Sequence, residues 1–397
     1  MENRFIGYIA AAGAFIVVAF VVVVNYYNLE VSSIFSIKNM LNTTWKNYTS
    51  EYVEAATGRV IDPSRNNVTT SEGVSYTMLR AVWIDDKDTF DKTFSWAKQT
   101  LQRKDKIFSW LFGKKTDGTY GVLTDQGGQN SASDADTNIA LALVFAAKRW
   151  SDPSYLSAAQ EIMRGIWEQE VVTIQGVPYL AADDIEKKSN SGVIINPSYL
   201  EPYAYRIFAS VDTTHPWTVL VGSSYDILEK STHIADGSNV GKMPPDWITI
   251  DQKTGALVPN ESSGLSSAYS YDALRIPWNI AMDYEWFKEP RAKQYLSTLD
   301  TLGTSWDKNQ KLFSAYGHNG TPVSSTEIPA MYGGGIGYFI VERPWTADRV
   351  YRDKILSNFN QDANTWVKPL SYYDDNWIWF GIALYNHLLP NLAAQST

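Results

Sequence analysis

Cysteine is absent from this sequence of 397 residues, and histidine is rare. Without cysteine the chain can form neither a disulfide framework nor a thiolate metal site. The histidines lie far apart, and none belongs to the H-E-x-x-H pattern of zinc enzymes; they are His215, His233, His318 and His387. We therefore expect no bound metal and no cofactor.

Clustered positive charge is also missing. The net charge is −9, and no basic stretch is longer than two residues, as in the Lys-Lys pairs at 114–115 and 187–188. Nucleic-acid binding needs several cations placed together to neutralise phosphates, so we expect no nucleic-acid partner. The same shortage argues against a polysaccharide lyase, which would need cations to neutralise a uronate.

The sequence is rich in apolar and aromatic residues. Hydrophobic residues make up 44% and charged residues 19%, which is enough for a large core. There are 15 Trp, 24 Tyr and 15 Phe. Most of these rings are expected in the core, but flat aromatic faces also suit stacking against sugar rings in a cleft. Composition alone leaves both interpretations open.

The first apolar segment is a run of twenty uncharged residues at 5–24, FIGYIAAAGAFIVVAFVVVV. As a helix this run is long enough to cross about 30 Å of hydrocarbon. A cleaved signal peptide usually has a shorter apolar stretch and a cleavage site of small residues. We predict an uncleaved transmembrane signal-anchor at 5–24, with a flank at 1–4, a short spacer at 25–33 and one large domain at 34–397.

The charges that flank this run favour one orientation. Arg4 and the N-terminal amine precede it, whereas Lys38 is the first cation after it. Positive residues tend to stay on the cytoplasmic side, so we expect the N-terminus inside and the large domain outside the cell. Tyr26 and Tyr27 are suited to the membrane–water interface. A cleaved signal and a secreted protein are the alternative.

From residue 34 onward the pattern is mostly helical. Apolar residues recur every three or four positions from Ile34 through Leu41 and Trp45 to Tyr52, and similar patterns follow along the chain. About twelve helices are expected; the others cover 72–84, 90–101, 134–150, 153–167, 198–210, 216–230, 272–287, 290–302, 330–341, 347–360 and 374–389.

Two features refine this picture. The stretch IALALVFAA at 139–147 has no polar face, as expected of a helix that is buried on all sides in a large all-α domain. The segments VVTIQGVPYLAA and ITIDQKTGALV alternate around glycine-containing turns and predict β-hairpins. Many helices of similar length, interrupted by short hairpins, indicate a single domain built as a layered helical barrel.

Carboxylates stand at the start of three predicted helices. Glycoside cleavage needs one carboxylic acid to protonate the leaving oxygen and one carboxylate to activate water or attack carbon. A helix dipole would lower the pKa of Glu72, but burial and a neighbouring carboxylate, for which Asp134 is the candidate, would raise it again. The three places are Ser-Glu-Gly with Glu72, SASDADTNIALALV with Asp134 and Asp136, and SYDALRIPWNIAMDY with Asp272, Arg275 and Asp283.

Each place also has a purely structural explanation. Ser71 can cap a helix, and the glutamate after it then lies where the helix dipole favours an anion. Ser133 and Asp136 have the spacing of a capping box. Asp272 and Arg275 can form an ion pair at i, i+3. Taken one at a time, these explanations compete with a catalytic role.

The stretches around these acids resemble the motifs of glycoside hydrolase family 8. WKNYTSEYVEAATGRVIDPSRNNVTTSEGVSYTMLRAV resembles the family's opening block around Ser-Glu-Gly, and ASDADTNIALALVFAAKRW fits the signature A-[ST]-D-[AG]-D-x-x-[IM]-A. YDALRIPW resembles its Tyr-Asp-x-x-Arg-x-Pro-Trp segment, while NPSYLEPYAYRIFAS and YYDDNWIWFGIALY match further blocks. The matches keep their order and span roughly 45–389.

This resemblance implies an (α/α)6 barrel and hydrolysis with inversion of configuration. Carried over to this chain, Glu72 is the general acid and Asp272 the general base. Asp134 would bind the distorted sugar ring near the point of cleavage. Tyr271 and Arg275 would position the base and its water.

The chain departs from the family pattern after Ser-Glu-Gly, where it has Ser75 and Thr77 in place of common glycines. This departure leaves the acid identified but leaves the shape of the cleft, and hence the preferred sugar, open. Trp110, Tyr372 and Tyr373 are candidates for aromatic side chains that bind the sugar.

The function that the resemblance implies is an endo-β-1,4-glucanase, held on the outer face of a membrane, that acts on a β-linked polysaccharide or oligosaccharide through a monomeric catalytic domain. The family also includes chitosanases, mixed-linkage glucanases and xylan-acting enzymes. An alternative from another class is an inactive glycan-binding or scaffold protein of a polysaccharide export system. The retained acid and base argue against that alternative, because a binding protein does not need them.

Overall fold

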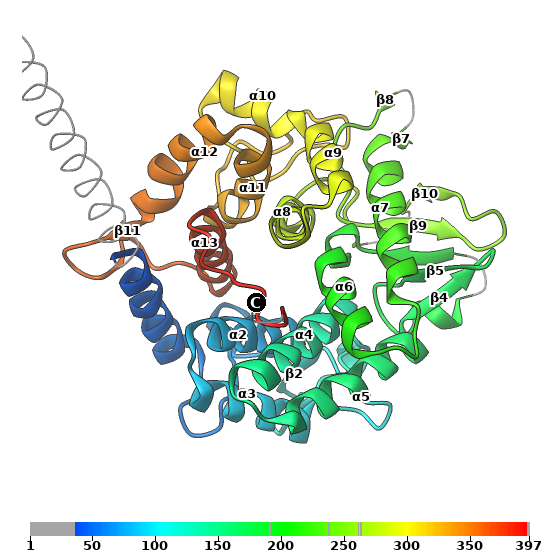
Figure 1. Cartoon of the computed structure of the whole chain (residues 1–397), viewed down its shortest axis with the longest axis vertical. Helices are drawn as coiled ribbons and strands as arrows, with labels where there is room; N and C mark the ends of the chain where they lie inside the picture. Colours follow the sequence, from blue (N-terminus) through cyan, green and yellow to red (C-terminus); the bar gives the residue numbers. More distant parts are fainter. Residues whose placement is uncertain (1–35, 190–191, 237–238, 261, 263, 395–397) are drawn as a thin grey trace, which may run out of the picture.

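The structure, a computed structural model, describes residues 36–189, 192–236, 239–260, 262 and 264–394. Its helices form two concentric rings (Figure 1). The inner ring contains α2 (Ser71–Ile84), α4 (Ser133–Arg149), α6 (Pro202–Val211), α8 (Ile276–Phe287), α11 (Pro329–Glu342) and α13 (Tyr372–Tyr385). The outer ring contains the helix over 36–52, α3 (Lys87–Thr100), α5 (Pro153–Gln169), α7 (Trp217–His233), α9 (Pro290–Thr298) with α10 (Asp300–Asn309), and α12 (Pro344–Val350).

Outer and inner helices alternate along the chain, so that all inner helices begin at the same end of the barrel. This is the (α/α)6 barrel that the sequence predicts. Most predicted helices begin and end within a few residues of the observed ones. The segment predicted at 290–302 is interrupted at Leu299, where α9 ends and α10 follows. The segment predicted from 198 begins at Pro202, because Pro197–Tyr199 forms a separate 3-10 helix.

Burial separates the two rings. In α4 every residue from Ser133 to Ala146 is buried, which confirms the expectation for the stretch without a polar face. In α3, by contrast, only Phe90, Thr93 and Ala97 are buried, and their spacing of three and four marks one face of a helix. The core of the protein is therefore the wall of inner helices together with the inward faces of the outer ones.

Glycines bring the backbone of α11 into direct contact with its neighbours. A Cβ atom added to Gly333 would lie 2.0 Å from the carbonyl oxygen of Trp377 in α13. One added to Gly337 would lie 2.2 Å from the carbonyl oxygen of Pro277 in α8. Real Cβ atoms do not come so close to backbone, so only glycine permits this packing.

Short antiparallel strands are inserted between the helices. The strands β4 (Val171–Ile174) and β5 (Val177–Leu180) form one predicted hairpin, and β9 (Ile248–Asp251) with β10 (Leu257–Pro259) form the other. Both predictions are confirmed, and β6 (Gly192–Ile195) extends the second hairpin to a sheet with the order β10-β9-β6.

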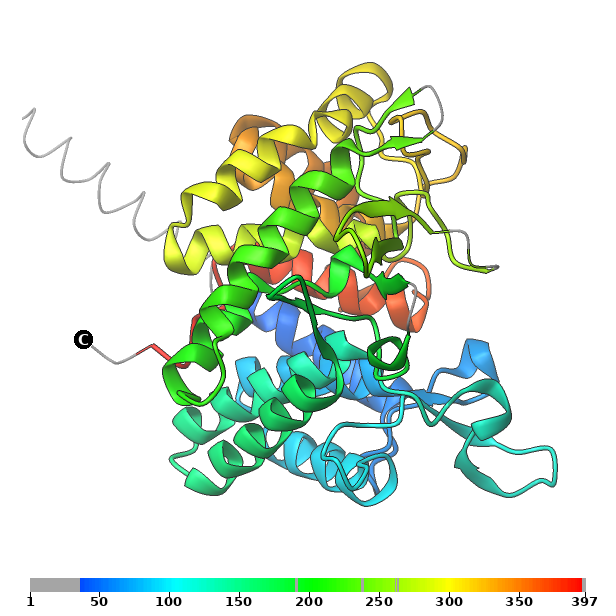
Figure 2. The same cartoon turned by 90° about the vertical axis from the view of Figure 1, so that its right-hand side faces the viewer.

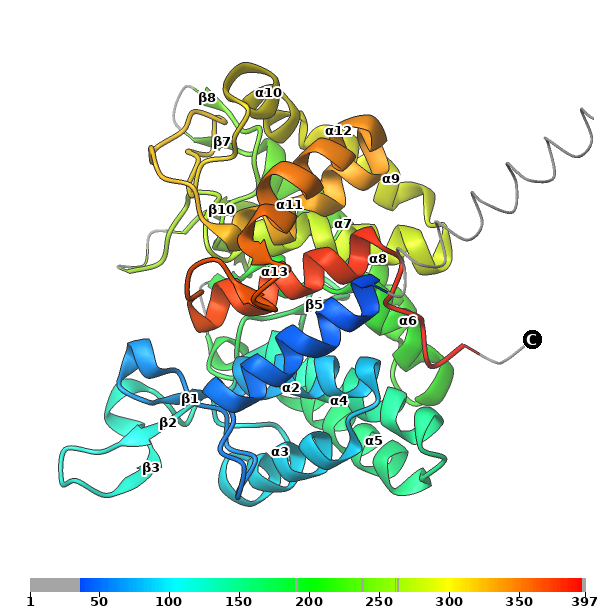
Figure 3. The same ribbon diagram turned by 90° about the vertical axis from the view of Figure 1, so that its left-hand side faces the viewer.

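A further sheet was not predicted and lies next to the first catalytic candidate. It has the order β1-β2-β3, with β1 (Thr69–Thr70) leading directly into α2. Figures 2 and 3 show β1 to β3 and β10 at one end of the barrel and the C-terminus at the other. The remaining strands of this sheet are β2 (Leu111–Lys114) and β3 (Tyr120–Val122), and the other short pairs are β7 (Ala235–Asp236) with β8 (Asn239–Val240) and β11 (Phe359–Asn360) with β12 (Thr365–Trp366).

The predicted signal-anchor at 5–24 and the spacer at 25–33 lie outside the described residues. In the part of the chain that is described, no helix is both long enough and apolar enough to span a bilayer.

Candidate active site

Glu72 is placed by the first turn of α2. Thr70 has an extended backbone, and its hydroxyl accepts the N–H of Gly73 at 3.1 Å. Thr70 is therefore the helix cap, and the expectation that Ser71 would cap this helix is wrong. The N–H of Ser71 instead donates to the carbonyl of Trp110 at 3.0 Å, which ties the start of α2 to the chain leading into β2.

Asp134 lies in the first turn of α4, and its side chain is only 5% exposed. The capping box suggested by the sequence is not formed. The hydroxyl of Ser133 donates to the carbonyl of Ala181 at 2.7 Å, and Asp136 Oδ1 accepts the N–H of Phe108 at 2.9 Å. Asp136 thus has a structural role, whereas Asp134 is available to the centre of the barrel.

Asp272 lies in a short connection that another carboxylate holds in place. It precedes the 3-10 helix Ala273–Arg275, which continues into α8. Asp246 Oδ1 accepts the N–H of Ser270 at 2.9 Å and the N–H of Ala273 at 2.8 Å, and the hydroxyl of Ser270 donates to Asp246 Oδ2. Asp246 is itself buried. These bonds fix the backbone on both sides of Asp272.

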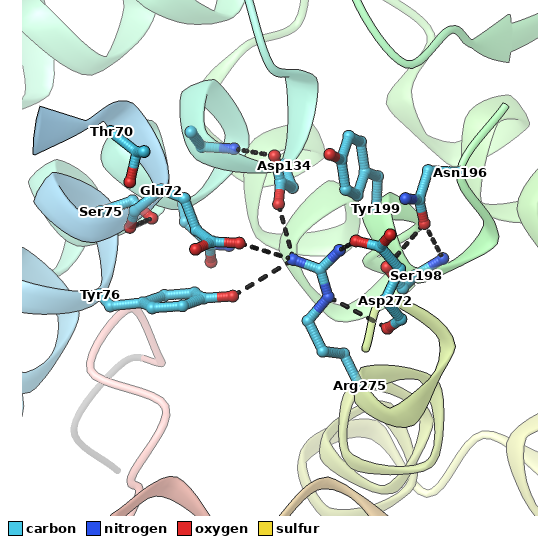
Figure 4. Close-up of polar contacts among 12 residues, drawn as sticks. Thr70, Glu72, Ser75, Tyr76, Asp134, Asn196, Ser198, Tyr199, Asp272 and Arg275 are labelled. Atoms are coloured by element: carbon cyan, nitrogen blue, oxygen red, sulfur yellow. Dashed lines mark hydrogen bonds and ion pairs between the residues drawn. The ribbon is translucent and has the colours of Figure 1, made fainter. Parts of the chain in front are cut away.

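Arg275 brings the three predicted acids together (Figure 4). Its Nη1 donates to Glu72 Oε2 at 3.1 Å and to Asp134 Oδ2 at 3.0 Å, and its Nη2 donates to Asp272 Oδ1 at 2.6 Å. The guanidinium also lies over the ring of Tyr199, 5.1 Å from its centroid. The ion pair expected between Asp272 and Arg275 therefore exists, and it is part of a larger cluster.

One cation faces three carboxylates in this cluster, so the negative charge is in excess. Burial raises the pKa of Glu72 to about 7; Arg275 opposes this shift, while Asp134 and Asp272 add to it. Burial also raises the pKa of Asp134. A substantial fraction of Glu72 is consequently protonated at neutral pH, as a general acid requires. The side chains of Glu72 and Asp272 are 27% and 28% exposed, so a substrate can reach both.

Tyr271 and Tyr373 lie together beside the cluster. Their ring centroids are 6.3 Å apart, and the hydroxyl of Tyr373 donates to the backbone carbonyl of Tyr271. Tyr271 is 56% exposed, an unusual value for an aromatic ring next to a buried charge cluster. Both residues are therefore placed where they could contact a bound sugar.

Tyr372 and Trp110 are placed differently. Tyr372 is only 6% exposed, and its ring is packed between those of Tyr48 and Tyr52. Its ring is thus almost completely covered in the structure, and a contact between Tyr372 and the substrate stays a prediction. Trp110 is partly buried beside the start of α2, and its indole N–H donates to the carbonyl of Gly127 at 3.0 Å. A contact between Trp110 and the substrate stays a prediction.

Three residues around Arg275 were missed in the sequence. Tyr76 accepts a bond from Arg275 Nη1 at 3.3 Å, and its position one helical turn after Glu72 was a usable signal. Tyr199 lies in the block NPSYLEPYAYRIFAS, which marked the region but not the residue. Asp246 carries no local signal, because it acts on a segment more than twenty residues away.

A small cavity of about 20 Å³ lies beneath Arg275, which is room for a single water molecule. Glu201 lines it and accepts bonds from Asn138 Nδ2 at 2.7 Å and from the hydroxyl of Tyr203 at 3.1 Å. Burial, with help from the charge of Asp134, raises the pKa of Glu201 to about 8. The centre of the barrel thus contains a second carboxyl group whose pKa is raised by burial.

No arrangement of three or more histidine or acidic side chains suited to a metal ion is found among the residues that the structure describes. The side chains that converge on Arg275 are carboxyl groups. A partly protonated acid and a second carboxyl group, both accessible at the end of the barrel where the inner helices begin, are the two groups that glycoside hydrolysis requires.

The chain belongs to glycosyl hydrolase family 8, whose family pattern matches residues 20–365. It is similar to the endoglucanase of Escherichia coli (strain K12), with 27% identity over 342 residues that cover 84% of this chain and 86% of that protein.

Two solved structures show the same fold. One is the endo-1,4-D-glucanase from Vibrio fischeri ES114, with a TM-score of 0.73 and 22% identity, over 86% of this chain and 94% of that one. The other is the β-1,3-1,4-glucanase from Paenibacillus sp. X4, with a TM-score of 0.72 and 20% identity, over 89% and 92%. Because enzymes with different substrates are about equally similar, the fold does not select the glycan.

Proposed function

We propose that this protein is an endo-acting β-1,4-glucanase that hydrolyses its substrate with inversion of configuration. The observation that carries the proposal is the convergence of Glu72, Asp134 and Asp272 on Arg275 at the end of the barrel where the inner helices begin. The name of the Escherichia coli relative, endoglucanase, supports the choice of an endo-acting enzyme with a glucan as its substrate.

Each group has a role in the proposed reaction. Glu72 gives its proton to the glycosidic oxygen as the bond from that oxygen to the anomeric carbon breaks. Asp272 takes a proton from a water molecule, whose oxygen forms the new bond to the anomeric carbon from the opposite face. Asp134 holds the sugar ring at the point of cleavage. Arg275 holds the three carboxyl groups in position throughout the reaction.

A reducing-sugar assay of the full-length chain in detergent tests the substrate class. Carboxymethyl-cellulose, lichenan, xylan and chitosan are compared at equal mass. We expect the fastest release from carboxymethyl-cellulose. Preference for lichenan, xylan or chitosan would assign another specificity of the same family. Unsaturated products would indicate a lyase, and binding without cleavage would indicate a glycan-binding or scaffold protein.

The anomeric form of the first product tests the mechanism. An inverting pair is separated by about 6.5–9.5 Å so that water fits between base and sugar, whereas a nucleophile pair is about 5–5.5 Å apart. Proton NMR of early products from a β-linked oligosaccharide should show the α-anomer before mutarotation. An initial β-anomer, or a covalent adduct on Asp272, would contradict inversion.

We also propose that the apolar run at 5–24 anchors the protein and that the barrel lies outside the cell. The full-length protein should then stay in the membrane fraction after an alkaline carbonate wash. A protein that begins near residues 25–35 after expression would instead show that the run is a cleaved signal.

A further inference from the structure

The two ends of the barrel have different surfaces. The inner helices begin at the end that carries the acids, and they finish at the opposite end, where the outer helices begin. Figure 3 shows the helix over 36–52 starting at this second end, away from β1 to β3. We call this second end the closed face, defined by the first residues of α7 and α12 and the last residues of α8, α11 and α13.

The closed face exposes apolar side chains that the active site does not explain. Trp345, the second residue of α12, is 87% exposed, while Ala347 and Val350 provide the buried side of that helix. Val219 near the start of α7 is 47% exposed, and Phe287 at the end of α8 is 37% exposed. A tryptophan so fully exposed to water contributes nothing to the core, and its ring is free to contact a partner outside the barrel.

A groove with both apolar and charged side chains lies beside this surface. It has a volume of about 450 Å³ and lies between the ends of α8, α11 and α13. Its lining combines the apolar Ile340 and Pro344 with the charged Glu285 and Asp348, and Pro344 directly precedes Trp345. The exposed indole therefore follows directly in sequence on a residue of the groove wall.

The length of chain outside the structure limits where this face can be. Eleven residues, 25–35, separate the proposed anchor from residue 36 at the closed face. Even fully extended, they reach no more than about 40 Å. The closed face thus stays close to the bilayer, but a tether of this length does not by itself fix the orientation of the barrel.

We propose that the closed face lies on the lipid surface, with Trp345 in the interface between headgroups and acyl chains. This inference rests on the proposed membrane anchor. Tryptophan is enriched at that interface because its ring is apolar and its N–H can remain hydrated. The net charge of −9 gives no general attraction to anionic lipid, so the contact is apolar. The acids at the other end of the barrel then face away from the membrane, toward a polymer outside.

Cysteine labelling can test this orientation, since the chain has no cysteine of its own. Thr346→Cys in α12 and Thr218→Cys in α7 place a fluorescent probe on the closed face. Thr116→Cys, in the exposed turn between β2 and β3, is the matched control at the active-site end. The labelled full-length proteins are reconstituted in phosphatidylcholine vesicles with or without a lipid that carries a quencher on its headgroup.

Probes at 346 and 218 should be quenched severalfold more than the probe at 116. Adding Trp345→Asp to Thr346→Cys should reduce quenching to the level of the control, while hydrolysis of carboxymethyl-cellulose in detergent is unchanged. Equal quenching at all three positions in protein that floats with the vesicles would overturn the orientation and leave the anchor intact. Protein that does not float with the vesicles would overturn both.

A second copy of the chain is the other possible occupant of this face. Sedimentation of the full-length protein in detergent, with and without Trp345→Asp, distinguishes self-association from contact with lipid. A dimer that this substitution dissociates would assign the closed face to self-association and overturn the proposal. A monomer in both cases supports lipid as the partner.

Discussion

Two buried arginines in this protein, Arg80 and Arg275, have opposite surroundings. Arg80 is completely buried in the wall between α2 and α13, where its Nη1 donates to Asp375 and Asn376 at 2.9 Å each. Its guanidinium also lies over three aromatic rings, those of Tyr48, Trp379 and Trp45. At Arg80 one cation is therefore paired with one carboxylate. The aromatic rings contact the guanidinium where water would otherwise solvate it.

Arg275 has three carboxylates within hydrogen-bond distance and only one positive charge to offer them. The matched cluster at Arg80 joins two helices. At the unmatched cluster around Arg275, burial together with the charges of Asp134 and Asp272 raises the pKa of Glu72 to about 7, which suits proton transfer rather than stability. The contrast shows that a buried ion pair alone does not reveal function, whereas the balance of charge around it does.

The largest effect should come from the carboxyl groups at Arg275. Glu72→Gln and Asp272→Asn should each lower kcat by about 10²–10⁴-fold, because each removes a group that transfers a proton in the reaction. Release of reducing ends measures this, and circular dichroism checks folding. Asp375→Asn at Arg80 is the matched control and should leave kcat per folded molecule unchanged. Normal turnover in either active-site variant would remove that residue from the proposed pair.

The free energy of unfolding, in contrast to kcat, should depend on the ion pair at Arg80. Arg80→Met should lower the free energy of unfolding by about 3–5 kcal/mol, because it leaves Asp375 buried without its cation. Denaturant titration followed by tryptophan fluorescence measures the loss. Adding Asp375→Leu should recover much of it, since no isolated charge then remains. If Arg80→Met is as stable as the parent protein, the ion pair does not hold α2 against α13.

Substitution of Asp246 should have a smaller effect on kcat. It tests whether this residue acts by positioning Asp272 or through its own charge. Asp246→Ala removes the acceptor for the backbone on both sides of Asp272 and should lower kcat by roughly 10–100-fold through misplacement of the base. KM should change little. Asp246→Asn keeps an oxygen that can accept the same N–H groups and should restore most of kcat. A loss in Asp246→Asn as large as in Asp246→Ala would mean that the charge, not the position, matters.

The smallest effect is a shift in pH dependence. Because the acid must carry its proton, kcat/KM should fall as the pH rises through about 7, the raised pKa of Glu72. Asp134→Asn removes a neighbouring negative charge and favours ionised Glu72, so this fall should move to lower pH by about one unit. Asp375→Asn should leave the midpoint unchanged. A shift to higher pH after Asp134→Asn would contradict the assignment of Glu72 as the acid.

Local patterns predicted the helices well because amphipathic spacing and capping act within a few residues. The exceptions arise where the local options were nearly equal. Thr70 and Ser71 are both good caps, and the extended backbone that continues β1 decides for Thr70. Similarly, β1 contains only two residues, too few for a recognisable alternation.

The site could be predicted where its acids stand at helix starts and where its residues fall in motifs that resemble those of the family. Tyr372 and Tyr373 are adjacent in the sequence, but successive side chains on a helix point about 100° apart, so one faces Tyr271 and the other enters the wall. Asp246 could not be found, because its partners at Ser270 and Ala273 are brought to it only by the fold.

The glycines of α11 have a mechanical consequence. Because Gly333 and Gly337 let the backbone of α11 touch α13 and α8, no deformable layer of side chains separates these helices at the contacts. Asp272 precedes α8 and moves with this stiff block, whereas Glu72 is carried by α2, which meets α13 through side chains such as Arg80. The base is thus carried by a helix in direct backbone contact with its neighbour, whereas the acid is carried by a helix that meets α13 through side chains.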